Sequence, residues 1–316
     1  MRVKRAFWIV GGLLTPLALG SLPLPTLPAW QRPGTVGFGD TLALSPDGAR
    51  LAASSADHAL VILDAATGAE LQRLTGHFGR ILALAWSPDG TRLISSSRDA
   101  TVRVWAVGSS RELRRVPVGK RLVLALAWNP TGLEVALGGA DGVVRLWRSG
   151  TAEVRALSGP GPGIAALAWS PDGAHLAAGG YAGVVRVWTS GRPVRDLPLG
   201  GVVRALAWSP DGAWLAAGGE TGQVHLWAVG GWRAGPVLSG PEGEVLALAW
   251  SPEGNRLASG GADLTVRIWE AGSGRPLQVL GPLPGPVHAV AWGPQGLVAG
   301  GAGVTAWPDS SPPPEE

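Results

Sequence analysis

Short apolar segments separated by polar turns recur along most of this chain. In Ile81–Trp86, large and small apolar residues alternate, a pattern that predicts a strand packed between two layers of side chains. Residues 87–90, Ser-Pro-Asp-Gly, follow with proline and glycine at positions that a type I turn favours. Three further strands are predicted at Arg92–Ser97, Thr101–Trp105 and Glu112–Val116, with polar turns between them. This unit is therefore expected to form a four-stranded antiparallel sheet.

The turn motif occurs seven times along the chain. Its prolines are spaced by 42, 42, 41, 39, 42 and 42 residues, and they are Pro46, Pro88, Pro130, Pro171, Pro210, Pro252 and Pro294. A period of about 40–45 residues that contains four short strands is typical of a propeller blade. We therefore expect an all-β protein, a seven-bladed β-propeller over residues 29–307.

The ring is predicted to close with a strand from the N-terminal side. Residues 308–316, Pro-Asp-Ser-Ser-Pro-Pro-Pro-Glu-Glu, are unsuited to a strand because proline lacks the amide donor, so a disordered tail is expected there. Residues 29–34, Ala-Trp-Gln-Arg-Pro-Gly, instead resemble residues 71–76, Leu-Gln-Arg-Leu-Thr-Gly, which precede the second unit. We expect residues 29–34 to supply the outer strand of the last blade and so to hide an otherwise unpaired sheet edge.

The unit that begins at Gly76 resembles the repeat of the WD-repeat family. In that family a His, a Ser or Thr, an Asp and a Trp form a hydrogen-bonded tetrad within a blade. The residues that match this tetrad are His77, Ser95 or Ser97, Asp99 and Trp105. The resemblance implies that these residues are structural.

The other units depart from the family pattern. Ala182 and Thr221 stand where the turn Asp is expected, and Gly-Gly replaces the Ser of the second strand. Tryptophan, however, recurs at two positions of the unit. Six Trp end first strands and six end third strands, and these are Trp86, Trp128, Trp169, Trp208, Trp250, Trp292, Trp105, Trp147, Trp188, Trp227, Trp269 and Trp307. Each buries a large apolar area, so packing of these rings is expected to hold the blades that lack a tetrad.

The resemblance also implies a recognition face, located at the loops that enter the first strands and at the turns before the third strands. The candidate residues are Arg80, Leu82, Arg98, Leu122, Leu124, Tyr181, Arg204, Glu220 and His288. Apolar side chains beside Arg suit a protein or peptide partner, although an ordinary exposed rim is an equally open interpretation. We interpret the chain as a non-enzymatic interaction scaffold and expect a monomer.

No motif for chemistry stands out in the sequence. The five His are not at metal-ligand spacing, no Cys is present, and the glycines fall at repeat turns rather than in a phosphate-binding loop. We therefore predict no catalytic residue, metal or cofactor. Ser-Pro-Asp-Gly turns also resemble those of TolB-like periplasmic propellers and hydrolase-associated propellers. An enzyme or small-ligand binder with a site in the central funnel thus remains the alternative.

The first 20 residues have the pattern of a secretory signal. Arg2, Lys4 and Arg5 precede an apolar run, and Ala18-Leu19-Gly20 fits a small-x-small cleavage site. The run is shorter than the ~20 residues that span a bilayer, so the mature chain is predicted to have no stable membrane span. Residues 21–28 are expected to be a Pro-rich spacer. We predict an exported protein, periplasmic or extracellular. The alternatives are a membrane anchor formed by an uncleaved N-terminal segment, and a cytoplasmic protein.

Removal of that segment changes the charge balance. The whole chain has 26 basic and 23 acidic residues, and three of the basic ones but none of the acidic ones lie in the first 20 positions. The mature chain is then formally neutral. Nucleic-acid binding normally requires a basic surface, so we predict no nucleic-acid partner. The lack of cysteine is compatible with an oxidising compartment.

Overall fold

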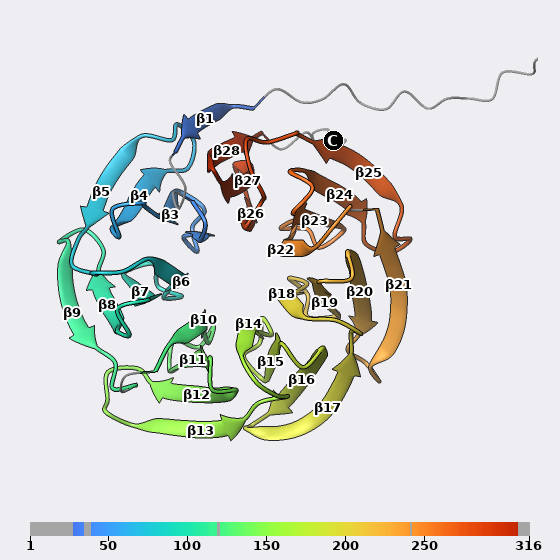
Figure 1. The fold of residues 1–316 in the computed structure, drawn as a ribbon, viewed down its shortest axis with the longest axis horizontal. Coiled ribbons are helices and arrows are strands. Elements are labelled where there is room, and N and C mark those ends of the chain that lie inside the picture. The colour runs from blue at the N-terminus through green and yellow to red at the C-terminus, as the bar shows by residue number, and fades with distance from the viewer. Residues whose placement is uncertain (1–27, 35–38, 119–120, 241, 309–316) are drawn as a thin grey trace, which may run out of the picture.

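The computed structural model describes residues 28–34, 39–118, 121–240 and 242–308 of the chain. These residues form seven four-stranded antiparallel sheets arranged as blades around a central axis (Figure 1). The predicted all-β, seven-bladed propeller is confirmed. The predicted signal at residues 1–20 lies outside the described residues, as do residues 21–27 of the spacer and 309–316 of the tail.

The first three blades follow the chain in order. The first contains β2 (Leu42–Leu44), β3 (Arg50–Ser54), β4 (Leu60–Asp64) and β5 (Glu70–Leu74). The second contains β6 (Ile81–Trp86), β7 (Arg92–Ser97), β8 (Val102–Ala106) and β9 (Arg111–Arg115). The third contains β10 (Val123–Trp128), β11 (Glu134–Gly139), β12 (Val143–Arg148) and β13 (Val154–Ser158).

The next three blades repeat this order. The fourth contains β14 (Ile164–Trp169), β15 (His175–Gly180), β16 (Val184–Thr189) and β17 (Arg192–Pro198). The fifth contains β18 (Val203–Trp208), β19 (Trp214–Gly219), β20 (Gln223–Ala228) and β21 (Arg233–Ser239). The sixth contains β22 (Val245–Trp250), β23 (Arg256–Gly261), β24 (Val266–Glu270) and β25 (Pro276–Leu280).

The seventh blade joins the two ends of the described chain. It contains β26 (Ala289–Gly293), β27 (Gly296–Gly301) and β28 (Gly303–Trp307), and its outer strand is β1 (Trp30–Pro33). Trp30 pairs with Ala306 and Pro33 with Gly303 in antiparallel register. The prediction that an N-terminal strand closes the ring is therefore confirmed, and Figure 1 shows β1 beside β28.

Strand limits within the second blade differ slightly from the prediction. β8 begins at Val102 rather than Thr101, because Thr101 belongs to the preceding turn. Its backbone amide and its hydroxyl both donate to Oδ1 of Asp99, at 2.9 and 2.7 Å. A residue held by the turn carboxylate in this way does not extend the strand ladder.

The hydrophobic core lies between neighbouring blades. Ile94 and Val104 of the second blade pack in one cluster with Val135 of the third. The first and last blades share such a cluster as well, in which Leu51 packs with Val304. Ring closure therefore rests on apolar burial in addition to the β1–β28 hydrogen bonds.

Tryptophans at the ends of first strands join successive blades through hydrogen bonds. Four of the six donate their indole N–H to a carbonyl in the first strand of the preceding blade: Trp86 to Ala43 at 2.9 Å, Trp169 to Ala127 at 3.2 Å, Trp208 to Ala168 at 3.1 Å and Trp250 to Ala207 at 3.1 Å. Trp128 donates instead to Gly132 in its own turn, and the buried indole nitrogen of Trp292 has no partner among the described residues. Each of the four rings that bridge two blades buries apolar surface and satisfies its polar atom.

Candidate functional site

The second blade contains a continuous chain of buried hydrogen bonds. His77 Nδ1 lies 2.8 Å from Asp99 Oδ2, and its Nε2 lies 2.9 Å from Ser95 Oγ. The indole of Trp105 donates to the same Ser95 oxygen at 2.8 Å. A carboxylate only accepts, so Nδ1 carries the proton that His77 donates to Asp99. The structure thus joins His77, Ser95, Asp99 and Trp105.

Electrostatics fix the protonation states in this chain. Burial lowers the pKa of His77 more than the nearby Asp99 raises it, so the ring is neutral at pH 7. Burial would raise the pKa of Asp99, but hydrogen bonds from Thr101, His77 and the Phe78 amide outweigh it and hold that pKa well below its usual range. The neutral Nε2 therefore accepts from the Ser95 hydroxyl.

The sequence left the choice between Ser95 and Ser97 open. Ser97 lies outside the chain, because its hydroxyl donates instead to the carbonyl of Gly79 at 2.7 Å. The expectation that Gly-Gly replaces the tetrad Ser is wrong in the sixth blade. There Ser259 precedes the Gly-Gly pair, and its hydroxyl accepts from the indole of Trp269 at 2.9 Å.

Sequence reasoning missed Arg103 as part of this chain. It is buried, its Nη1 lies 2.8 Å from Glu112, and its Nη2 lies 3.7 Å from Asp99. Its guanidinium carbon lies 6.0 Å from the centroid of Trp105. The Val-Arg-x-Trp pattern of four third strands was the available signal, because it places an Arg two residues before the Trp in each of them.

The candidate recognition residues lie on the face where the chain enters the first strand of each blade. Arg80 is about half exposed, and its Nη2 lies 2.5 Å from the buried carboxylate of Asp40 in the first blade. Arg98 occupies the turn between β7 and β8 and is exposed, and its amide donates to the Arg80 carbonyl. Leu122, at the entry to the third blade, is 39% exposed.

Other candidates surround the mouth of the central channel. The structure places Leu82, Leu124, Arg204 and His288 together there, among the small apolar residues of the first strands. His288 is exposed. Asp40 is the one carboxylate among the described residues that line the channel.

The remaining candidates lie over the fourth to sixth blades. The guanidinium carbon of Arg204 is 5.6 Å from the centroid of Tyr181, and its Nε lies 3.2 Å from Glu244. Glu220 accepts a hydrogen bond from the Val202 amide at 3.0 Å. Arg204 and Glu220 therefore already have partners within the protein. The Tyr181 ring is the part of this group that is exposed to solvent.

The decisive comparison is with known protein families. The chain matches the family described as WD domain, G-beta repeat, over residues 68–106, 113–148, 152–189, 191–228 and 234–270, which is more than half of its length. The protein belongs to the WD-repeat family. No curated protein matches it. Each matched range begins near the outer strand of one blade and ends with the third strand of the next, so the WD repeat is offset from the blade by one strand.

The described residues lack two kinds of element. They contain no group of three or more His, Asp or Glu side chains arranged to hold a metal ion. They also contain no helix that is long and apolar enough to cross a membrane. WD-repeat propellers generally mediate protein interactions and are typically scaffolds rather than enzymes.

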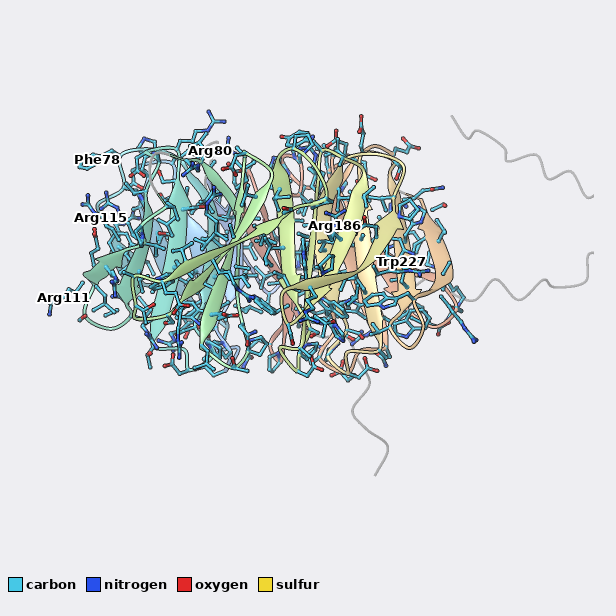
Figure 2. All side chains as sticks on the ribbon, turned by 90° about the horizontal axis from the view of Figure 1, so that it is seen from below. Phe78, Arg80, Arg111, Arg115, Arg186 and Trp227 are labelled. Atoms are coloured by element: carbon cyan, nitrogen blue, oxygen red, sulfur yellow. The ribbon has the colours of Figure 1, made fainter. Side chains whose placement is uncertain are left out.

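One exposed residue of this face was missed by sequence reasoning. Phe78 follows the tetrad His77 and is 84% exposed, the highest value among the large hydrophobic residues described. The next residue, Gly79, packs closely against Arg98, since a Cβ at position 79 would lie 3.3 Å from that of Arg98. Figure 2 shows Phe78 and Arg80 at the same face of the ring, and Arg111 toward the opposite one. In the sequence, the only feature that pointed to Phe78 was its position directly after the Gly-His pair.

Proposed function

We propose that this WD-repeat propeller is a scaffold that binds a protein or peptide across the second and third blades. The binding surface, named here the Phe78 face, consists of Phe78, Arg80, Arg98 and Leu122. The observation that carries the proposal is the exposure of Phe78, because a large aromatic side chain held out by a rigid loop is a typical binding anchor. The Phe78 amide is held by Asp99 at 3.0 Å, so the tetrad positions the anchor.

The chemistry of the Phe78 face favours an apolar and acidic partner segment. Phe78 and Leu122 offer apolar contact, whereas Arg98 has no side-chain partner within the described residues. Arg80 already neutralises Asp40 and so contributes less free charge. A partner segment with an aromatic or aliphatic residue beside an Asp or Glu would match this arrangement.

We also propose that the protein acts outside the cytoplasm. The support is the pattern of residues 1–20, in which a basic start precedes an apolar run and a small-x-small site. N-terminal sequencing of the protein from its native host should find a chain that begins near Ser21 in an extracytoplasmic fraction. A soluble cytosolic chain that still begins at Met1 would contradict export and leave the binding proposal intact.

Selection of peptide ligands tests the Phe78 face directly. Peptides from a random displayed library are selected on the immobilised protein, and their affinities are then measured for Phe78→Ala, Arg98→Ala and Leu122→Ala. We expect Phe78→Ala to weaken binding about tenfold or more, as loss of an anchor does, and the other two to weaken it less. The matched control is Arg111→Ala, which removes an exposed Arg toward the opposite face. Selected peptides that bind all three variants at full strength would refute the proposal.

A further inference from the structure

Tryptophans at the blade junctions are covered in a regular way on the face of the Ser-Pro-Asp-Gly turns. At four of the junctions the first residue of a second strand lies over the first-strand Trp of the next blade. The covering groups are Arg50 over Trp86 at 5.1 Å, Arg92 over Trp128 at 5.6 Å, Arg256 over Trp292 at 4.7 Å, and His175 stacked on Trp208 at 5.9 Å. Three of the four are guanidinium groups in cation–π geometry.

The junction between the third and fourth blades reverses this pattern. Its corresponding residues are Glu134 and Trp169. The reversal extends to the turn as well, because each covering Arg lies near an acidic residue of its own turn, as in the pairs Asp47–Arg50 at 3.8 Å, Asp89–Arg92 at 3.7 Å and Glu253–Arg256 at 3.9 Å. In the third blade the acidic turn position is Thr131. An internal ion pair is thus replaced by a single carboxylate beside an indole.

Asn129 keeps the third and fourth blades joined, in a role that Arg50 has between the first two blades. In the first blade Arg50 also donates to the carbonyl of Gly90 in the next turn, at 3.1 Å. In the third blade Asn129 donates to the corresponding carbonyl of Gly173 at 3.2 Å. The junction therefore keeps its hydrogen bond between turns without an arginine, and none of the described cations covers the ring face of Trp169.

A cavity of about 120 Å³ lies at this junction. Its lining includes Asn129, Glu134, Arg155, Trp169 and Trp188. This volume holds several water-sized groups, so it has room for a planar guanidinium. Glu134 is half-buried, and no described side chain forms a hydrogen bond or an ion pair with its carboxylate. A half-buried carboxylate without a partner favours a ligand that brings positive charge.

We propose that the pocket of Glu134 and Trp169 binds the guanidinium group of an arginine in a peptide or protein partner. The planar group would stack on Trp169 and pair with Glu134, which repeats in trans the contact that Arg50, Arg92 and Arg256 make in cis. A compact ammonium group stacks less well and cannot form a bidentate pair. This site lies at the opposite ends of the strands from the Phe78 face, so it is independent of the function proposed above.

Arg155 limits the affinity of the pocket. It lies at the rim against the turn glycine of the fourth blade, where a Cβ at Gly191 would come 2.5 Å from its Nη1. It does not pair with Glu134, yet its charge opposes the entry of another cation. Replacement of Arg155 by Gln should therefore tighten binding, which a purely structural role of the pocket would not predict.

Tryptophan-indole NMR of the ¹⁵N-labelled full-length chain tests the proposal. The probes are acetyl-Gly-Arg-Gly-amide, its Lys and Gln analogues, and methylguanidinium, and the Trp169 signal is assigned with Trp169→Phe. We expect a saturable shift of Trp169 with the Arg peptide, weaker binding of the Lys analogue and no binding of the Gln analogue. Tighter binding of the Arg peptide than of methylguanidinium assigns the site to a polypeptide partner, and equal binding assigns it to small guanidinium compounds.

Two variants and one control complete the experiment. Glu134→Gln should weaken binding about tenfold, the size of one charge-assisted hydrogen bond. Glu134→Arg should abolish binding and leave the spectrum well dispersed, because it supplies the covering Arg that three other junctions have. Glu253→Gln removes an acid at a junction that Arg256 already covers and should change nothing. No Trp169 shift with the Arg peptide, or equal binding by wild type and Glu134→Gln, would overturn the proposal.

Discussion

The second and fourth blades reach the same burial of their third-strand tryptophan by different means. Trp105 and Trp188 are each 2% exposed. Trp105 is the end of the hydrogen-bonded chain through Ser95 and His77. In the fourth blade, the positions of His77, Ser95 and Asp99 are Pro160, Ala178 and Ala182, which cannot form such a chain. Apolar packing of the indole is therefore sufficient to build a blade, and the tetrad is an addition to it.

The third-strand arginines differ in burial between a blade with a tetrad and a blade without one. In the second blade Arg103 is almost fully buried and lies near Asp99 and Glu112. In the fourth blade the corresponding Arg186 pairs with Asp196 at 2.7 Å on a more exposed surface. The tetrad thus draws charge into the interior, which is favourable only when every group has a partner. In the second blade the tetrad holds the entry loop through the Phe78 amide, and in the fourth blade the charged pair stays partly exposed.

Removal of the two tryptophans gives the largest expected effect. Trp105→Ala and Trp188→Ala should each lower the free energy of unfolding by about 3–5 kcal/mol, because each leaves a large cavity in a packed core. Denaturant unfolding followed by circular dichroism measures both. Similar losses would support packing as the common basis of the blades. A much smaller loss for Trp188→Ala would show instead that hydrogen bonding is what makes the indole valuable.

Carboxylate removal should separate the tetrad from an ordinary turn. Asp99→Ala should cost about 1–3 kcal/mol, because it leaves His77 and the Thr101 and Phe78 donors without their acceptor. The matched change is Asp141→Ala in the third blade, where the side chain is 34% exposed and pairs with Arg145. Its loss should cost about 1 kcal/mol, less than the loss of Asp99, because the Asp141 carboxylate stays partly exposed to water. Equal losses measured by denaturant unfolding would mean that the tetrad adds nothing to stability.

Acid titration should produce the smallest effect. Burial lowers the pKa of His77 in the folded state, so below about pH 6.5 the unfolded chain takes up the proton more readily, and stability declines. The lowered pKa of Asp99 adds a further loss below about pH 4. His77→Gln should therefore flatten the fall in melting temperature between pH 7 and 5. An unchanged pH profile would mean that His77 is not the group that titrates.

The fold could be predicted from the sequence because the repeat is regular. Seven Pro-x-Gly turns and twelve regularly spaced Trp predict the number of blades, and the likeness of residues 29–34 to 71–76 predicted the closing strand. The site was less predictable. Ser95 and Ser97 lie two positions apart on one strand and point to the same side, so only the register of β6 and β7 distinguishes them. The exposure of Phe78 depends on loop geometry, for which the sequence has no periodic signal.

The Glu134 pocket shows a different limit of prediction from the sequence. Glu134 is visible in the sequence as the one acidic member of a column that also holds Arg50, Arg92 and Arg256. The sequence does not show that this column lies over the tryptophan of the following blade. The contact crosses from one repeat to the next, and its meaning appears only when the blades are packed.

The closing strand has a consequence for the order of events during synthesis. Trp30 pairs with Ala306, so the first described strand finds its partner only after nearly the whole propeller has left the ribosome. Until then β1 has an unpaired edge, and the first blade lacks the neighbour that covers Leu51. Contacts this distant in sequence slow folding and lengthen the exposure of aggregation-prone edges. Among the described segments, β1 and the first blade therefore wait longest for the partners that cover them.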